Sequence, residues 1–441
     1  MHGEGSELER VGAVLLGLPD FAVLAAAEVG GEIELVVQTV AGPVGCPRCG
    51  LVAAGKGRRP ALVRDLPTRG LPVVLIWHKR LWACPDSVCP QGSWTETHPQ
   101  VRARAVLTER ARRWAFEQVG RCKRTVAAVA AELGVGWWTV MRAVRGFGEP
   151  LVDAPVWVDG VSAVGVDEHA FLAATAIKPT TYVTGVVDIT PGRPPRLLDV
   201  LPGRSGKIYA EWLAGQEQAW RDQVRVAALD PFRGYATALR TELPAAQRVL
   251  DAFHVTRLGF AALDEVRRRV QHDTTGHRGR RGDPLYGIRR VLRRGRDKLT
   301  DRARARMLAG LDAGDPQGEV AAAWTVAHQL REVYQARTSQ DGRRRAAAAE
   351  AAALTCPVPE VRRLGRTLRS WRAEWLAYFH TGGASNGPVE AINLNIETSR
   401  RIAYGFRNFR NYRLRLLLAY GHTWQTSLTP RIRGPHPLIV A

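Results

Sequence analysis

The 441-residue chain lacks several features that would place it in common classes of protein. It has no run of about 18 uninterrupted apolar residues, so the sequence predicts no membrane-spanning helix. Residues 1–10 are acidic where a secretory signal peptide would be basic. The 6 cysteines are too few for a disulfide framework in a chain of this length. We therefore expect a cytoplasmic protein whose cysteines have another purpose.

Acidic residues are also scarce beside basic ones. The chain has 63 Lys and Arg against 42 Asp and Glu, which gives a formal net charge of +21. A field of that sign attracts polyanions, above all nucleic acid, and an anionic membrane surface is the weaker alternative. The 45% of hydrophobic residues is typical of a globular protein, and the length suggests roughly two to four domains. These features predict a multidomain protein that binds nucleic acid.

Four of the cysteines occur as two close pairs, Cys46 with Cys49 and Cys84 with Cys89. Each pair lies beside a predicted strand, and neighbouring Gly and Pro residues predict a tight turn at each. Four thiolates on two such turns form the tetrahedral donor set of a structural zinc site, as in zinc-ribbon modules. The alternative is four cysteines that hold no metal. The two predicted strands cover residues 31–40 and 71–84.

Two histidines near these turns are alternative ligands. His78 and His98 could substitute for a thiol, although four thiols already complete the coordination shell of zinc. Cys122 and Cys356 stand alone in the sequence. We interpret these two cysteines as packing residues.

The next segment has the spacing of a helix-turn-helix motif. A helix predicted over residues 104–120 is followed by an apolar helix at 125–133, a Gly-Val-Gly turn at 134–136 and a second helix at 137–144. In such motifs the second helix lies in the major groove of DNA. The alternative is an ordinary helical hairpin whose Ala and Val residues form a local core. The strongly basic chain and the preceding zinc module favour DNA binding.

Polar and basic residues of this motif are candidates for DNA contact. Thr139 and Arg142 lie on the second predicted helix and Arg145 directly follows it, and all three are predicted to contact the major groove. Lys123 and Arg124 begin the motif and are predicted to bind phosphates.

Beyond Pro150 and Pro155 the sequence alternates strand and helix patterns in the order βββαβαβ. This order is the plan of the ribonuclease H-like fold, an α/β fold whose first and fourth strands lie side by side in one mixed sheet. Asp167 on the first predicted strand and Asp230 at the end of the fourth would then face each other at one sheet edge. The predicted strands cover residues 162–169, 180–189, 195–202, 224–230 and 247–254, and the predicted helices cover 208–220 and 231–240.

The region from 255 to 380 shows no strand pattern and is predicted to form long helices rich in Arg and Ala. Its run RRVLRRGR at 289–296 fits either a solvated helical face or a track of phosphate contacts. Further on, Asn386 is predicted to cap a helix that Pro388 opens, with Glu390 in the first turn.

Three acidic residues form a set that suits phosphodiester chemistry. Hydrolysis of a phosphodiester without an organic cofactor uses two divalent ions, and Mg²⁺ takes carboxylate ligands. Asp167, Asp230 and Glu390 fit, because two lie on strands and the third lies on a later helix that can pack across the sheet edge. Taken singly, each acid is more often a surface or capping carboxylate. The competing acids are Glu168, Asp188 and Asp199.

The motifs together resemble those of the ISL-three family of bacterial insertion-sequence transposases, which are DDE recombinases with an N-terminal zinc finger and a helix-turn-helix. CPRCG with the later cysteine pair resembles the family's zinc finger. VGVDEHAF and VAALDPFRGY resemble its first two catalytic blocks, and LDAFHVTRL resembles its Asp-x-Phe-His block. SNGPVEAIN followed by RRIAYGFRNFRNYRLRLLL is similar to its terminal block, the most specific of these motifs.

The resemblance covers most of the chain and implies roles for particular residues. It implies that Asp167, Asp230 and Glu390 are the catalytic triad and hold Mg²⁺ or Mn²⁺. It implies that the helical region between Asp230 and Glu390 is the insertion that such transposases carry. Asp251 and His254 match the Asp-x-Phe-His block and are expected near the site.

The sequence departs from the family pattern at two positions. Pro388 stands where a basic residue is usual before the glutamate, and Glu397 stands where the family commonly has Lys. Both departures predict weaker contact with DNA. Neither concerns a proposed metal ligand.

These interpretations predict a DDE transposase that binds the terminal inverted repeats of an insertion sequence, cleaves DNA at the element ends and transfers the 3′ ends to target DNA. It would carry structural Zn²⁺ and act as a homo-oligomer, because two ends are cut together. The alternatives are a domesticated, inactive transposase that acts as a sequence-specific DNA-binding protein, and a structure-selective nuclease without strand transfer. All three acids of the triad are present, which argues against the former.

The predicted domains are a zinc module at 1–100, a helix-turn-helix domain at 101–150, the two parts of the ribonuclease H-like core at 151–254 and 381–441, and an all-α insertion at 255–380.

Overall fold

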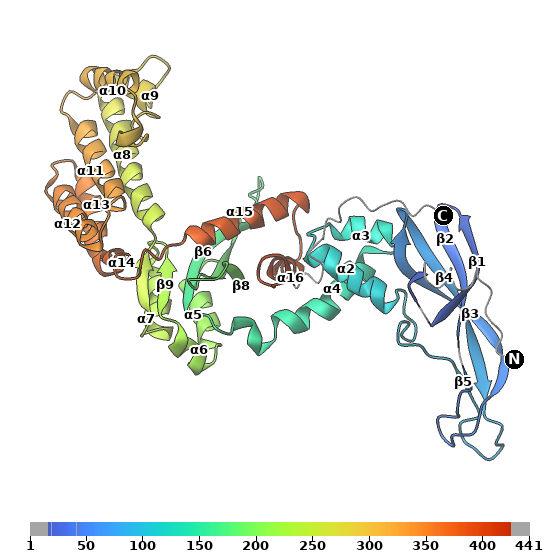
Figure 1. Ribbon diagram of the computed structural model, residues 1–441. Helices are drawn as coiled ribbons and strands as arrows, with labels where there is room; N and C mark the ends of the chain where they lie inside the picture. Colours follow the sequence, from blue (N-terminus) through green and yellow to red (C-terminus); the bar gives the residue numbers. More distant parts are fainter. Residues whose placement is uncertain (1–15, 19, 41, 425–441) are drawn as a thin grey trace, which may run out of the picture. The chain divides into compact units, whose positions relative to one another are not determined.

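The computed structural model describes residues 16–18, 20–40 and 42–424 (Figure 1). The acidic segment 1–10 and residues 425–441 of the predicted C-terminal block lie outside the described residues. The chain divides into two compact units, Met1–Trp157 with Ser399–Ala441 and Val158–Thr398. Within the described ranges, no helix is both long and apolar enough to cross a membrane.

The first unit contains a five-stranded sheet whose strands lie in the spatial order β1-β2-β4-β3, with β5 beside β4. β2 and β4 pair in parallel, and the other pairs are antiparallel. Phe21, Leu75 and Trp77 are fully buried in the core on this sheet. The strands are β1 (Phe21–Val29), β2 (Glu32–Thr39), β3 (Ala54–Thr68), β4 (Leu71–Ala83) and β5 (Ser93–Thr95).

The two strands that the sequence predicted in this sheet are confirmed as β2 and β4. β1 and β3 were not predicted. β3 contains Pro60 and Pro67 and a run of exposed polar residues, and these hide its strand pattern. It lies at the edge of the sheet, where proline is tolerated because one side of the strand makes no ladder hydrogen bonds.

Three helices of the first unit confirm the spacing predicted for a helix-turn-helix. The turn before the last helix passes through Gly134, whose φ of +62° favours glycine. The first helix begins at Glu109 and not at 104, because the Thr108 side chain accepts a hydrogen bond from the N–H of Ala111 and caps the helix. The third extends past the predicted end at 144. The helices are α2 (Glu109–Gly120), α3 (Val126–Glu132) and α4 (Trp137–Val152).

The helix α16 (Phe409–Tyr420) also belongs to the first unit and packs against α2 and α4. Gly148 on α4 allows this approach, because a Cβ atom there would lie 2.9 Å from Cδ1 of Leu418. Arg145 of α4 donates a hydrogen bond to Oδ1 of Asn411 at 2.7 Å. The block predicted at 381–441 therefore contributes helices to both units.

The second unit contains a mixed five-stranded sheet in the order β10-β9-β6-β7-β8. β6, β7 and β8 are antiparallel, and β9 and β10 run parallel to β6. The predicted neighbourhood of the first and fourth strands is confirmed, and the helix predicted at 208–220 is split in two. The elements are β6 (Ala163–Leu172), β7 (Thr181–Asp188), β8 (Arg196–Pro202), α5 (Gly206–Ala214), α6 (Gln218–Gln223), β9 (Val226–Leu229), α7 (Arg233–Glu242) and β10 (Gln247–Leu250).

Two strand ends differ from the predictions. β6 continues to Leu172, so Asp167 lies within the strand and not at its end. β10 stops at Leu250, because the Asp251 side chain accepts a hydrogen bond from the N–H of His254 and starts a helix there. Both differences change the backbone that presents a candidate site residue.

The two faces of β6 have different partners. Val164 and Val166 are fully buried in the same core as Tyr209 of α5 and Tyr235 of α7. Side chains alternate along a strand, so Gly165 and Asp167 point to the opposite face. On that face the ideal Cβ position of Gly165 lies 2.4 Å from a methyl of Val389. The start of α15 (Gly387–Ile402) therefore packs on this second face.

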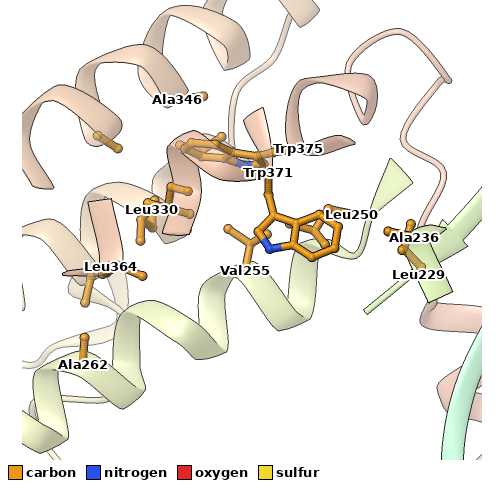
Figure 2. Close-up of a cluster of buried hydrophobic side chains, with 14 of the residues drawn as sticks. Leu229, Ala236, Leu250, Val255, Ala262, Leu330, Ala346, Leu364, Trp371 and Trp375 are labelled. Atoms are coloured by element: carbon orange, nitrogen blue, oxygen red, sulfur yellow. The ribbon is translucent and has the colours of Figure 1, made fainter. Parts of the chain in front are cut away.

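Between β10 and α15 the described chain contains helices and no strand. Helix α14 packs against β10, so the helical region and the sheet share one core. Figure 2 shows Leu229 and Leu250 of the strands near Val255, Trp371 and Trp375 of the helical region. The helices are α8 (Ala252–Thr275), α9 (Pro284–Ile288), α10 (Asp301–Gly314), α11 (Glu319–Val333), α12 (Ser339–Thr355), α13 (Pro359–Ser370) and α14 (Arg372–Ala377).

Some arginines of the helical region bind acidic residues of neighbouring helices. Arg269 of α8 pairs with Glu319 of α11 at 2.9 Å and with Glu360 of α13 at 2.6 Å. Within the RRVLRRGR run, Arg293 lies 3.7 Å from Asp264 of α8. A part of the positive charge therefore forms ion pairs within this unit.

Candidate functional site

The register of β6 and β9 brings two predicted site residues together. Val166 pairs with Leu229 in the parallel ladder. Asp167 and Asp230 are the next residues of the two strands, so their backbones continue side by side. Asp167 is 7% exposed, and Asp230 lies directly after the end of β9.

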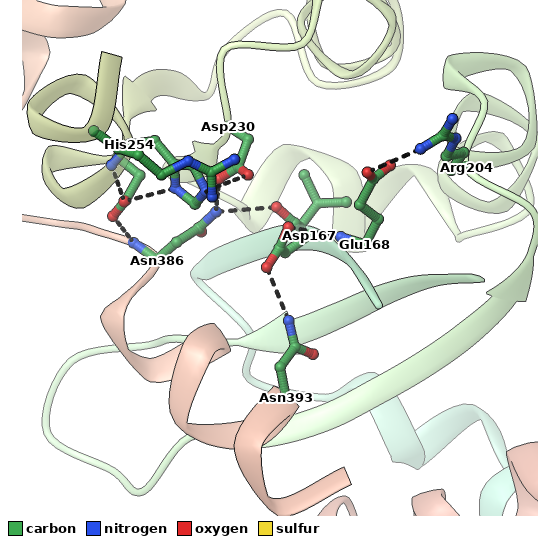
Figure 3. Close-up of polar contacts among 10 residues, drawn as sticks. Asp167, Glu168, Arg204, Asp230, His254, Asn386 and Asn393 are labelled. Atoms are coloured by element: carbon green, nitrogen blue, oxygen red, sulfur yellow. Dashed lines mark hydrogen bonds and ion pairs between the residues drawn. The ribbon is translucent and has the colours of Figure 1, made fainter. Parts of the chain in front are cut away.

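Asn386 connects the strands that carry these carboxylates (Figure 3). Its side-chain Nδ2 donates hydrogen bonds to the carbonyl of Val166 at 3.0 Å and to Oδ1 of Asp230 at 3.2 Å. Its backbone N–H donates to Oδ1 of Asp251 at 2.8 Å. The residue is fully buried. The sequence predicted that the Asn386 side chain caps α15, but its Oδ1 has no hydrogen-bond partner among the described residues, and only the backbone carbonyl accepts from the N–H of Glu390, at 2.9 Å.

The first turns of α15 present three polar residues on one helical face. Asn386 precedes Glu390 by four residues, and Asn393 follows Glu390 by three, which places all three on one side. Asn393 donates a hydrogen bond to Oδ2 of Asp167 at 2.8 Å. Asn393 was not among the site residues predicted from the sequence. The helical spacing of polar residues around Glu390 was the signal that could have found it.

The charges of Asp230 and Glu390 both act on the carboxyl of Asp167. Burial and the neighbouring charge of Asp230, with a further contribution from Glu390, raise the pKa of Asp167 to about 7. Like charges that are held close favour protonation of one of them. The charge of Glu390 therefore reaches Asp167, but among the described residues here the group whose ligand atoms converge within 4.8 Å is Asp230, Asp251 and His254 and does not include Asp167 or Glu390.

His254 lies between two of the acids. Its Nε2 is 2.9 Å from Oδ2 of Asp230, and its Nδ1 is 3.0 Å from Oδ2 of Asp251. Burial lowers the pKa of His254, but the hydrogen bonds that its ring donates to both carboxylates outweigh burial and raise it to about 10. The ligand atoms of Asp230, Asp251 and His254 all lie within 4.8 Å of one another, so these three residues could also hold a metal ion.

The competing acids have other partners. Glu168 points away from Asp167 and lies 3.3 Å from Nη1 of Arg204 (Figure 3). Asp188 is fully buried and lies 2.7 Å from Nη2 of Arg193. Asp199 accepts a hydrogen bond from Nε1 of Trp212 at 2.8 Å. These contacts stabilise the sheet and its neighbouring elements.

The four cysteines of the predicted zinc turns converge in the first unit. Their ligand atoms all lie within 4.8 Å of one another. Sγ of Cys46 is 3.8 Å from Sγ of Cys89, and Sγ of Cys49 is 3.5 Å from Sγ of Cys84. The pairing of β3 with β4 explains why the cysteines converge. The last pair of this ladder is Ala54 with Ala83, so the turn before β3 and the turn after β4 lie at the same end of the two strands. Four thiols at these distances fit a tetrahedral zinc ion.

The turn of the first pair also favours the thiolate. Burial raises the pKa of Cys46, but the backbone N–H groups of Cys49 and Arg48 outweigh burial and lower it to about 7. His98 lies elsewhere and packs edge to face on Phe21 and Trp77. The cluster among the described residues consists of cysteines alone, without His78 or His98.

Two of the predicted DNA contacts lie in a basic groove of the first unit. Thr139 and Arg142 of α4 line a cavity of about 300 Å³ together with Arg102, Arg104 and Arg112. Nε of Arg102 lies 2.6 Å from Oε1 of Glu109, and Nη1 of Arg112 lies 2.7 Å from the same oxygen, so Glu109 holds both guanidinium groups. The groove therefore presents several guanidinium groups beside the second helix of the motif.

The other three predicted DNA contacts have partners within the same unit. Arg145 binds Asn411, as described above. Arg124 forms a salt bridge with Glu132. The ammonium of Lys123 lies 4.4 Å from the centre of the Tyr420 ring. The structure therefore brings Thr139 and Arg142 together and places the remaining three residues apart from them.

A zinc finger, a helix-turn-helix and a carboxylate site on a mixed sheet are the parts of a transposase, and family comparisons identify each part. A family model described as "Transposase" matches residues 164–416, more than half of the chain. The "Helix-turn-helix domain of transposase family ISL3" matches residues 96–147, and the "zinc-finger of transposase IS204/IS1001/IS1096/IS1165" matches residues 42–89. The chain belongs to the ISL3 transposase family, which confirms the resemblance of its motifs.

Individual relatives are more distant. The chain is 25% identical over 319 residues to the "Transposase for insertion sequence element IS1557" of Mycobacterium tuberculosis, with 65% of this chain and 66% of that protein covered. The match thus spans just under two thirds of the relative's length. The "Transposase for insertion sequence element IS1001" of Bordetella parapertussis is 26% identical over 299 residues, with 65% and 68% covered.

One solved structure is similar at a low level. The "Drosophila P element transposase strand transfer complex" is 12% identical, with a TM-score of 0.37, and the match covers 73% of this chain and 95% of that chain. A TM-score this low does not establish a shared fold.

We expect the double variant Cys46→Ser, Cys84→Ser to lose a bound zinc ion, because it removes half of the converging thiols. Elemental analysis of the purified wild type should give about one zinc per chain, and the variant should give far less. Cys122→Ser is the control, because Cys122 is exposed and outside the cluster. Equal zinc content in the double variant and the wild type would contradict the assignment.

We expect Asp167→Asn to raise the melting temperature at neutral pH in buffer without Mg²⁺. The pKa of Asp167 in the folded protein is about 7, above its ordinary value of 3.8. Between these values the unfolded carboxyl is ionised while the folded one holds a proton, so the stability of the wild type falls as pH rises from about 4 to about 7. Asparagine removes this dependence and still accepts a hydrogen bond from Asn393. Melting curves of both proteins across this pH range measure the difference in melting temperature. A variant that is less stable than the wild type at every pH would refute the repulsion between Asp167 and its neighbouring acids.

Proposed function

We propose that this chain is a DDE transposase that cleaves DNA at the ends of an insertion sequence and joins the 3′ ends to target DNA. The observation that carries the proposal is the adjacency of Asp167 and Asp230 on paired strands, with α15, the helix of Glu390, hydrogen-bonded to Asp167 through Asn393. Asp167 and Asp230 continue adjacent strands, and the charge of Glu390 on α15 contributes to the raised pKa of Asp167. Membership of the ISL3 family supports the same assignment.

The arrangement of the second unit supports a ribonuclease H-like core. The order β10-β9-β6-β7-β8, with only β7 antiparallel to its neighbours, agrees with the plan inferred from the sequence. We propose that the helices from α8 to α14 form an insertion into this core. The proposed domain boundaries remain those inferred from the sequence, at residues 100, 150, 254 and 380.

The donor set fits a hard divalent cation. The three acids supply carboxylate oxygens, and their mutual repulsion, seen in the pKa of Asp167, is relieved by a cation. Asp167, Asp230 and Glu390 would hold Mg²⁺ or Mn²⁺. When bound, such ions lower the barrier for in-line displacement at phosphorus.

Neighbouring residues of the chain orient these ligands. Asn393 holds one oxygen of Asp167 at 2.8 Å. Asn386 and His254 hold the two oxygens of Asp230, at 3.2 and 2.9 Å. Carboxylates that are already held in place lose less conformational freedom on binding of the cation and DNA than freely rotating ones would. We infer that Asn386, Asn393 and His254 are positioning residues of the site.

We propose that the first unit recognises the terminal inverted repeats. Thr139 and Arg142 line the basic groove and are free to reach base edges, and the other arginines of that groove suit phosphates. Arg145 instead stabilises the motif through Asn411. Because two element ends are cut together, we propose that the active form is a homo-oligomer. A DNA-binding regulator without cleavage is the alternative, and the complete carboxylate set argues against it.

The metal-ligand role of Glu390 can be separated from helix capping. Glu390→Gln keeps size and hydrogen bonding but removes the charge that a divalent ion needs. We expect the variant to fold and to bind element-end DNA. In Mg²⁺ it should nick this DNA more than about 100-fold more slowly than the wild type. Loss of a residue that only orients a metal ligand usually has a smaller effect, of about 10-fold to 100-fold. A capping role would cost about 1 kcal/mol of stability and spare cleavage.

Glu168→Gln is the matched control for this experiment. Glu168 follows Asp167 on the same strand but points to the opposite face, where it pairs with Arg204. The control should nick element-end DNA at the wild-type rate. Substantial nicking by Glu390→Gln would remove Glu390 from the triad.

Two arginines of α4 should respond differently to truncation. Arg142→Ala should lower the preference for inverted-repeat DNA over random duplex by about 1 to 3 kcal/mol and leave the melting temperature unchanged. Arg145→Ala should lower the melting temperature, because it removes the hydrogen bond to Asn411. Fluorescence anisotropy with both duplexes and thermal melting measure these effects. An Arg142→Ala protein that discriminates as well as the wild type would refute its role.

A further inference from the structure

A second cavity of the first unit, of about 480 Å³, lies at the start of α4. Its lining combines the first turns of α3 and α4 with the loop that joins α15 to α16. This volume is within the range of about 300 to 1,000 Å³ that is typical of small-molecule sites. Thr139 and Arg142 do not line it, so it is distinct from the basic groove.

Aromatic side chains form much of the cavity wall, and three of them are open to solvent. Trp137 is 38% exposed, Trp138 is 58% exposed and Tyr404 is 97% exposed. Trp137 and Trp138 meet edge to face, with ring centroids 4.8 Å apart. Large aromatic residues are mostly buried in folded proteins, and a group of exposed ones marks a binding surface.

The backbone at Tyr404 is held in a costly conformation. Its φ is +54°, in the left-handed region that is uncommon for residues other than glycine. The N–H of Tyr404 donates to the carbonyl of Arg401, and the N–H of Gly405 donates to the carbonyl of Arg400, which closes the end of α15. Such strain is often found at ligand sites. Here it accompanies an aromatic ring that is almost fully exposed.

The charge around the cavity is positive. Arg407 and Arg415 line it, and none of its described lining residues is acidic. Arg407 is exposed and makes no ion pair with the described residues. The guanidinium of Arg415 lies 4.9 Å from the Phe406 ring. Helix α4 starts at Trp137, a lining residue, and its N-cap Gly136 provides no side-chain cap for the N–H groups of the first turn.

We propose that this cavity binds an unpaired nucleotide of the DNA. The base would stack on Trp138 and Tyr404, and its phosphate would lie near Arg407 and the first turn of α4. A flat, apolar wall with adjacent cations matches a nucleotide, which has an aromatic base and an anionic phosphate. An apolar peptide would not use the cations. The inference rests on the proposed DNA binding and adds a preference for unpaired over paired DNA.

The test uses the full-length protein and two duplexes that carry the same element end. One is fully paired, and the other has a short unpaired 3′ overhang that contains 2-aminopurine. Fluorescence anisotropy gives the affinity for each probe. Because stacking on an aromatic ring quenches 2-aminopurine, its fluorescence reports directly on the base in the cavity.

We expect the wild type to bind the overhang probe more tightly and to quench its 2-aminopurine. Trp138→Ala and Tyr404→Ala should each lower the ratio of the two affinities by about 5-fold to 150-fold, the range measured for the loss of one base-stacking ring. Both residues are exposed, so loss of either ring should not prevent folding. Trp138→Phe should keep most of the preference. Ile177→Ala, which removes an equally exposed apolar residue of the second unit, should change nothing.

Three outcomes would overturn the proposal. Wild-type protein that binds both probes equally would remove the nucleotide site and leave the proposed function intact. Alanine variants that keep the preference and the quenching would also remove it. Variants that change only the oligomeric state, measured by light scattering, would show that a second copy of the chain covers the cavity. Failure of the wild type to bind either DNA would instead overturn the proposed function together with this inference.

Discussion

One buried amide holds the candidate active site together. Asn386 donates to the carbonyl of Val166, to the carboxylate of Asp230 and, through its backbone, to Asp251. These partners belong to β6 and to the ends of β9 and β10, so a single residue ties three strand segments to the start of α15. The position of Glu390 follows, because it lies one turn later on the same helix face. Loss of this amide would leave buried carbonyl and carboxylate groups unpaired, which is expensive in free energy.

The site collects negative charge, and its surroundings hold that charge in place. Burial and repulsion raise the pKa of Asp167 to about 7, whereas His254 stays protonated beside Asp230. The imidazolium thus compensates the charge of Asp230, but the repulsion at Asp167 remains. Such an arrangement lowers the stability of the free protein and favours ligand binding, as is common where function competes with stability.

The positive charge of the chain is divided between structure and surface. Arg269 joins helices of the second unit, and Arg145 joins helices of the first. Arg104 and Arg142 line one groove, and Arg407 lines the aromatic cavity. Net charge alone indicates an anionic partner, but it does not show which guanidinium groups remain available. That distinction sets which substitutions should affect DNA binding and which should affect stability.

The sequence determined the parts that depend on local spacing. The cysteine pairs, the helix-turn-helix and the strand order follow from turns and periodicity, so they could be predicted, and the three acids were predicted as a set. Only the tertiary structure decided the roles of Asn386 and Asn393, the inward position of Arg145, and the course of β1 and β3. Their partners lie far away in sequence or across a sheet edge, and no local pattern encodes a contact between residues that only folding brings together.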